Sequence, residues 1–188
     1  MAVRPITITG EPVLHRPAAE VTAVDDDLRA LVADMFETMD AAPGVGLAAP
    51  QVGVGLRLFV YSWVDDEGES WRGVAINPQL WQSPLGTEPL DEDDESEGCL
   101  SIPGERFPLR RAEHALLQAT DLDGVDYEIE AHGWLARIFQ HEYDHLDGVL
   151  YADRLEHPLY KAAAKSVKRS GWGVAGKTWL PGVDHLDD

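Results

Sequence analysis

Cysteine, basic charge and long apolar runs are scarce in this 188-residue chain. Its single cysteine, Cys99, excludes an intrachain disulfide framework. The chain has 15 lysines and arginines but 34 acidic residues. The resulting net charge of −19 argues against a protein whose main task is to bind nucleic-acid phosphates. No segment reaches the roughly 20 apolar residues of a membrane span. We therefore expect neither DNA nor a membrane as a partner.

A secretory signal is also missing from the first residues. They read Met-Ala-Val-Arg-Pro-Ile-Thr-Ile, without an apolar stretch and a small-residue cleavage site. The hydrophobic share of 44% and the charged share of 26% are near the norm for globular proteins. The sequence therefore predicts a single domain over residues 1–188, located in the cytoplasm.

Helical patterns occur in three segments. The acidic run 25–27 offers an N-cap, apolar residues at helical spacing follow it, and the pair Pro43-Gly44 ends this first helix. Residues 134–145 predict a second, central helix with one apolar side. Residues 159–188 are expected to form a C-terminal helix, over 159–170, and an extended tail that packs through its tryptophans.

Strand patterns fill much of the remaining chain. Residues 56–64 are rich in β-branched and aromatic side chains, and 73–77 predict a short partner strand that Pro78 ends. Residues 114–121 and 125–131 flank an Asp-Gly turn and predict an antiparallel hairpin. The fold class is therefore α+β, with antiparallel strands packed around the central helix.

Three other stretches are expected to be irregular. Residues 1–24 read as an extended arm with a turn signal at 10–12. Residues 44–51 have side chains too small for a core strand. The acidic residues 88–97 are typical of a solvated loop, above all in their first part.

The strongest chemical signal is an H-E-x-x-H motif, His141-Glu142-Tyr143-Asp144-His145, on the predicted central helix. Positions i and i+4 share one helical face, so both imidazoles can bind one metal ion. Glu142 projects to the side where water on that metal would lie, and can accept the water's proton and later pass it to the leaving group. The alternative is a helix that merely contains two exposed histidines.

A catalytic metal site also needs a third protein ligand and one open position. The metzincin extension of the motif is met as far as Gly148, but its last position holds Tyr151 in place of histidine. Glu156 is a downstream carboxylate that lacks the context of a helix-borne ligand. Upstream, Cys99 is the remaining candidate, although a lone cysteine is more often a small buried residue. A thiolate with two imidazoles would suit ferrous iron, zinc, nickel or cobalt.

Three segments resemble the signature motifs of the peptide deformylase family, in the family's order and with similar separations. They are residues 44–51 (Gly-Val-Gly-Leu-Ala-Ala-Pro-Gln), 97–101 (Glu-Gly-Cys-Leu-Ser) and 140–146 (Gln-His-Glu-Tyr-Asp-His-Leu). The resemblance extends over residues 10–155. The long acidic stretch and the tail beyond Ser170 resemble features of actinobacterial type 1 members.

The resemblance implies metal-dependent hydrolysis that removes the formyl group from the formyl-methionine of newly made proteins and releases formate. It implies one divalent metal ion, Fe2+ in the cell, with Zn2+, Ni2+ or Co2+ possible. The implied residues are the ligands Cys99, His141 and His145; the general base and acid Glu142; the oxyanion donors Gln51 (side-chain amide) and Leu100 (backbone N–H); and the contacts of the substrate backbone Val45, Gly46, Gly98 and Arg106. Trp134 and Ile138 are candidates for an apolar methionine pocket.

A basic stripe on the predicted C-terminal helix suggests a second partner. Lys161, Lys165 and Arg169 stand at i, i+4 and i+8, on an otherwise acidic protein. In the family a C-terminal helix docks on the ribosome near the exit tunnel. The resemblance thus implies that helix 159–170 contacts ribosomal RNA phosphate, and an ordinary solvated helix face is the alternative.

Other functions compete with this one. A zinc endopeptidase could use the same helix, but the downstream ligand is missing. A catalytically inactive, deformylase-like binding protein gains no support, since Gln51, Cys99 and the H-E-x-x-H residues are all present. A structural zinc domain would need protein in the fourth ligand position, and no second cysteine exists to fill it.

Overall fold

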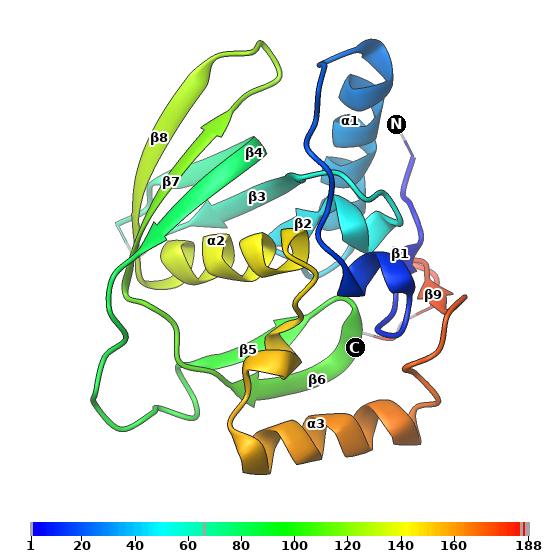
Figure 1. Cartoon of the computed structure of the whole chain (residues 1–188), viewed down its shortest axis with the longest axis vertical. Helices are drawn as coiled ribbons and strands as arrows, with labels where there is room; N and C mark the ends of the chain where they lie inside the picture. The colour runs from blue at the N-terminus through cyan, green and yellow to red at the C-terminus, as the bar shows by residue number, and fades with distance from the viewer. Residues whose placement is uncertain (1, 66, 185, 187–188) are drawn as a thin grey trace.

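The central element of the fold is helix α2 (Gly133–Leu146), as the sequence predicts. A computed structural model describes residues 2–65, 67–184 and 186. In it α2 lies between a five-stranded antiparallel sheet and a separate β-hairpin, with helix α3 (His157–Arg169) beyond the hairpin (Figure 1). The predicted α+β class, with antiparallel strands around a central helix, is confirmed.

The five-stranded sheet covers one side of α2. Its order is β2 (Gly46–Ala48), β3 (Leu58–Val64), β4 (Ser70–Gln82), β7 (His114–Thr120) and β8 (Asp126–His132). On β7, Ala115, Leu117 and Ala119 alternate inward and pack with Phe139 of α2 in one core cluster. The predicted β7–β8 hairpin and its Asp-Gly turn are confirmed, with Gly124 at φ +76°.

Helix α1 (Asp26–Ala41) packs on the other face of the sheet. It begins as predicted, because the Asp25 side chain accepts a hydrogen bond from the Leu28 N–H at 2.9 Å and so caps the first turn. Its buried stripe, which includes Met35 and Met39, joins Val60 of β3 in a second core cluster. The sheet is therefore covered by helices on both faces.

Strand β4 is longer than predicted. The chain continues as a strand through Pro78 to Gln82, although proline lacks the N–H that a ladder needs. The register between β4 and β7 shifts between Ile76 and Gln79, and Asn77 adopts φ +47°. Because this irregularity removes Pro78 from the regular ladder, the strand tolerates it.

The expectation that residues 44–51 contain no core strand is wrong. Gly46–Ala48 form β2, a fully buried edge strand of the sheet, and the 3-10 helix Ala49–Val52 follows. The hairpin of β5 (Ser96–Cys99) and β6 (Ile102–Pro108) was not predicted, nor were the 3-10 helices Pro12–His15 and Tyr151–Arg154. The acidic loop before β5 is largely exposed, as predicted.

The C-terminal tail packs through its tryptophans, as expected. Trp179 lies in the two-residue strand β9 (Thr178–Trp179), which pairs with β1 (Ile6–Thr7), and only 1% of its surface is exposed. Trp172 is partly buried against the core. Residues 185, 187 and 188 of the predicted tail lie outside the described residues. Within the described chain, no helix has the length and apolar character to cross a membrane.

Trp179→Ala should lower the free energy of unfolding by about 3–5 kcal/mol, because it opens a cavity in the core beside α1. Trp81→Ala is the matched control, since Trp81 is 59% exposed, and should change stability by no more than about 0.5 kcal/mol. Chemical denaturation of both variants measures the difference. Equal losses would show that the tail is not part of the core.

Candidate active site

The three predicted metal ligands meet although they come from two separate elements. Cys99 is the last residue of β5, whereas His141 and His145 are one turn apart on α2. His145 Nε2 lies 3.3 Å from Cys99 Sγ and 3.2 Å from His141 Nε2. All three residues are buried, and their ligand atoms lie within 4.8 Å of one another.

This cluster has the dimensions of a tetrahedral metal site. Ligands at Zn–S and Zn–N bond lengths are about 3.3–3.6 Å apart in that geometry, close to the separations found here. Burial lowers the pKa of His145 well below its ordinary value, which favours the neutral imidazole that binds metals. The donor set therefore fits a divalent ion with an open fourth position.

Glu97 orients the ring of His141. Its Oε1 lies 2.6 Å from His141 Nδ1, so a proton on Nδ1 leaves Nε2 facing the cluster. Burial raises the pKa of Glu97, but the bond to His141 and the nearby Arg111 outweigh it and lower this pKa well below its usual range. Glu97 is thus charged. Its carboxylate accepts from Nδ1 of His141, as an acceptor that orients a metal-ligating histidine does.

Glu97 is not among the site residues that the sequence predicts, although it lies in a motif. The signal that could have found it is strand alternation. Glu97 and Cys99 are two residues apart on β5 and are the buried positions of that strand. A carboxylate on the same strand face as a candidate ligand is a candidate for orienting the other ligands.

The charges around His141 favour a cation. Burial lowers the pKa of His141, but Cys99 and Glu97 together raise it well above its ordinary value. The negative charges of Cys99 and Glu97 that favour a protonated His141 would favour a metal cation in the cluster for the same reason.

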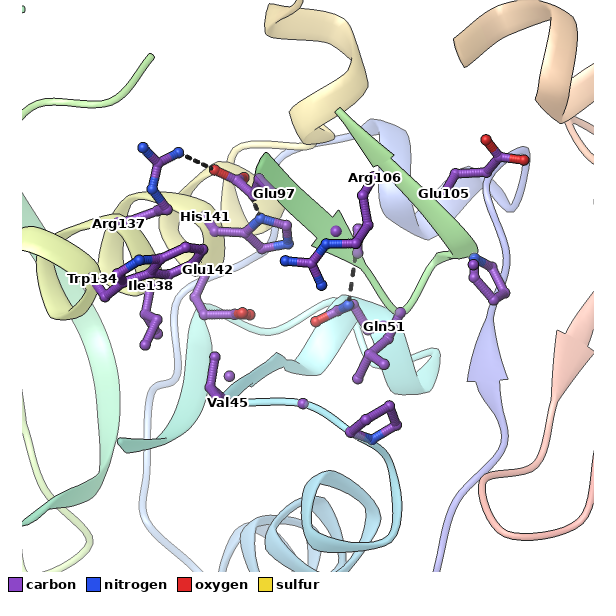
Figure 2. Close-up of a pocket in the computed structure, with 18 residues that line it drawn as sticks. Val45, Gln51, Glu97, Glu105, Arg106, Trp134, Arg137, Ile138, His141 and Glu142 are labelled. Atoms are coloured by element: carbon purple, nitrogen blue, oxygen red, sulfur yellow. Dashed lines mark hydrogen bonds and ion pairs between the residues drawn. The ribbon is translucent and has the colours of Figure 1, made fainter. Parts of the chain in front are cut away.

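Glu142 points its carboxylate into the space beside the cluster (Figure 2). Its Oε2 is buried and has no hydrogen-bond partner among the described residues. Burial raises the pKa of Glu142 to about 7, and a metal ion nearby would lower it. A Cβ atom at Gly46 would overlap this carboxylate, so a larger residue there would displace it. The group is placed and tuned to exchange protons near neutral pH.

The Gln51 amide is locked with its donor toward the cluster. Its Oε1 accepts from the Ala48 N–H at 2.8 Å, which leaves Nε2 facing Cys99 Sγ at 3.8 Å (Figure 2). Leu100, in the turn between β5 and β6, lines the same cavity. Its carbonyl accepts from Trp179 Nε1 at 2.8 Å, so the tail helps to hold this turn. Gln51 can thus present a donor to the cluster, and Leu100 borders the same space.

A cavity of about 380 Å³ connects these groups. It runs between the β2 edge and the β5–β6 hairpin, with Trp134 and Ile138 at one end (Figure 2). The structure brings together all the predicted site residues: Val45, Gly46, Gln51, Gly98, Cys99, Leu100, Arg106, His141 and Glu142 line the cavity, and His145 lies against its ligand partners.

The two downstream candidates for a third ligand lie elsewhere. The Tyr151 ring stacks on His141 with centroids 6.1 Å apart, and its hydroxyl donates to the Glu105 carbonyl at 3.0 Å. Glu156 is exposed and directly precedes α3. Neither residue belongs to the ligand cluster, so the downstream ligand that the endopeptidase alternative needs is missing from this site.

Comparison with known proteins matches residues 3–160 to the family described as polypeptide deformylase. The chain is 51% identical to peptide deformylase 2 of Corynebacterium efficiens, over 98% of this chain and 96% of that protein. It is 52% identical to the peptide deformylase of Mycolicibacterium paratuberculosis, over 97% and 96%. The solved peptide deformylase of Ehrlichia chaffeensis in complex with actinonin has a TM-score of 0.78 and 37% identity, over 90% of this chain and 98% of that one. The expected resemblance to actinobacterial members is confirmed.

Glu97→Gln should weaken Zn2+ binding by about 10–100-fold, because the neutral amide no longer holds His141 as a charged carboxylate does. Competition with a chromophoric chelator measures the affinity. Glu95→Gln is the matched control, since Glu95 also approaches Arg137, at 3.6 Å, but is not among the contacts of His141. Wild-type affinity in Glu97→Gln would contradict the assignment.

Proposed function

Because the chain belongs to the polypeptide deformylase family, we propose that Cys99, His141 and His145 hold the divalent metal ion on which its reaction depends. That reaction removes the N-formyl group from the formyl-methionine of newly made peptides. One observation supports the assignment above all: the amide of Gln51 and a carboxylate oxygen of Glu142, which has no hydrogen-bond partner in the described part of the chain, converge on the ligand cluster. Ligands, base and donor thus surround one reaction centre.

A metal ion here would polarise the formyl oxygen and acidify a water molecule. The thiolate offsets part of the ion's charge, and this donor set accommodates ferrous iron, zinc, nickel or cobalt. Ferrous iron is the ion that we propose for the cell.

Glu142 moves the proton in this mechanism. Water adds to the formyl carbon, and Glu142 accepts the proton that the water loses. As the bond between the formyl carbon and the methionine nitrogen breaks, Glu142 passes that proton to the nitrogen and formate leaves. Burial raises its pKa, and a nearby metal ion would lower it, so the two effects oppose each other in a group that must both take and give a proton.

Gln51 and Leu100 stabilise the negative charge that develops on the formyl oxygen. Gln51 offers its Nε2–H, with its orientation fixed by the bond to Ala48, and Leu100 offers its backbone N–H. Donors of this kind are worth about 3–4 kcal/mol each to the barrier. Because their positions are set before substrate binds, no reorganisation is needed during the reaction.

The peptide would lie along the cavity as an added strand. Val45 and Gly46 border it on the β2 side, and Gly98 with Arg106 on the hairpin side. Backbone pairing gives affinity with little dependence on sequence, which suits an enzyme that processes many different new chains. The methionine side chain would occupy the end with Trp134 and Ile138, where its sulfur can contact the indole ring.

Glu142→Gln should reduce formate release from formyl-Met-Ala-Ser by about 10²–10⁴-fold, because the amide cannot accept the proton. Anaerobically purified, ferrous-loaded protein is used, with metal content measured in parallel. An acetylated peptide and an unblocked peptide are the substrate controls, and neither should react. Formate release at the wild-type rate from the metal-loaded variant would exclude Glu142 as the base.

We also propose that α3 contacts the ribosome through its basic stripe. Lys161, Lys165 and Arg169 are exposed on one side of the helix, whereas Ser166 is buried against Glu105 of β6. Exposed lysines on an acidic protein suit an RNA phosphate surface. Nascent formylated chains and ribosomes share the cytoplasm, where we place this protein as well.

Reversing Lys161 and Lys165 to glutamate should weaken co-sedimentation with ribosomes and leave hydrolysis of a free formyl-peptide unchanged. Arg169 is left intact because it contacts Glu105 at the cavity, at 3.3 Å. Reversal of the exposed Arg16 and Lys177 gives the same change in net charge elsewhere on the surface. Equal co-sedimentation of the two double variants would refute the α3 proposal.

A further inference from the structure

The ligands of the proposed metal site come from a strand and a helix, and no backbone pairing of a shared sheet sets the distance between these two elements. β5 carries Cys99, and α2 carries His141 and His145. Something must therefore fix the distance between the thiolate and the imidazoles. We infer that Arg111 does so, and that it is a positioning residue for the metal; the inference rests on the proposed metal site.

Arg111 binds a carboxylate on each of the two elements. Its Nε and Nη2 donate to Glu97 at 3.1 and 2.7 Å, and its Nη1 donates to Asp144 Oδ2 at 2.6 Å. The side chains of Arg111, Glu97 and Asp144 are 6%, 4% and 4% exposed. The guanidinium is thus a buried bridge between β5 and α2.

Both carboxylates are close to ligands. Glu97 is two residues before Cys99 and hydrogen-bonds His141, and Asp144 directly precedes His145. Arg137, on α2 itself, already attaches Glu97 to the first half of the helix at 3.2 Å. Arg111 extends the attachment to the second half, where His145 lies. A shift of Arg111 would therefore alter the separation of Cys99 and His145.

The backbone beside Arg111 is anchored on the same helix. The side chain of Gln140 accepts from the Ala112 N–H at 2.9 Å and donates to the Ala112 carbonyl at 2.8 Å. Gln140 is 2% exposed and directly precedes His141. Because its neighbouring backbone is held at both polar groups, Arg111 has little freedom to follow a displaced partner.

Lysine cannot replace this bridge. The planar guanidinium meets two carboxylates through a rigid fork of donors, whereas an ammonium group is a compact point charge. Loss of Arg111 does not leave either carboxylate without a cation. Glu97 keeps Arg137, and Asp144 keeps Arg154, whose Nε donates at 2.6 Å. Arg111 variants should therefore fold, with their defect concentrated at the metal site.

The test compares Arg111→Lys and Arg111→Gln with wild type for Zn2+ affinity, by chelator competition, and for the visible absorption of the Co2+-loaded protein. Both variants should bind Zn2+ about 10–100-fold more weakly, the range seen when partners of metal ligands are removed. Their Co2+ spectra should differ from that of wild type, because coordination geometry changes. Circular dichroism establishes that each variant is folded.

Arg154→Gln is the matched control, since it removes a cation from the same Asp144 without touching β5. It should keep the wild-type affinity and Co2+ spectrum. Wild-type values in folded Arg111→Lys and Arg111→Gln, or equal losses in Arg154→Gln, would overturn the inference. If wild type itself bound no metal, the proposed metal site would fail, and the inference with it.

Discussion

The hydrogen bond between His141 and Glu97 is the contact on which the rest of the site depends. It joins the helix that carries His141 and His145 to the strand that carries Cys99, and it directs Nε2 of His141 toward the cluster. A carboxylate in the interior is costly unless it is paired, and Glu97 is paired with both Arg111 and Arg137. The proposed metal site and the buried ion pairs are therefore connected through Glu97.

Space around Glu142 is the second constraint. Glu142, the proposed general base, lies on α2, and β2 passes so close to it that a side chain at position 46 would displace the carboxylate. Because Gly46 has no side chain, it also leaves room for a peptide backbone in the cavity beside β2. Small residues in this segment thus leave room for the proposed base and the proposed substrate backbone, which gives this buried strand a composition unlike that of ordinary core strands.

Local signals predicted the elements that local forces stabilise. The Asp25 cap and apolar stripe of α1, the Asp-Gly turn of the β7–β8 hairpin and the period of α2 were all readable in the sequence. β2, β5 and β6 were not, because their residues have weak intrinsic strand preference and become strands only through pairing, β2 with β3 and β5 with β6. The extension of β4 through Pro78 likewise depends on a register shift that only its partner strand reveals.

The order of amino acids alone establishes which groups are available for chemistry. Helical periodicity places His141 and His145 on one face whatever surrounds them, and the order of the three motifs indicates the family. Only the tertiary structure decided that Cys99, 46 residues before His145, lies 3.3 Å from it, and that Glu97 and Arg111 bridge their elements. The reason is physical: helix geometry follows from neighbouring residues, whereas contacts between distant segments depend on how the whole core packs.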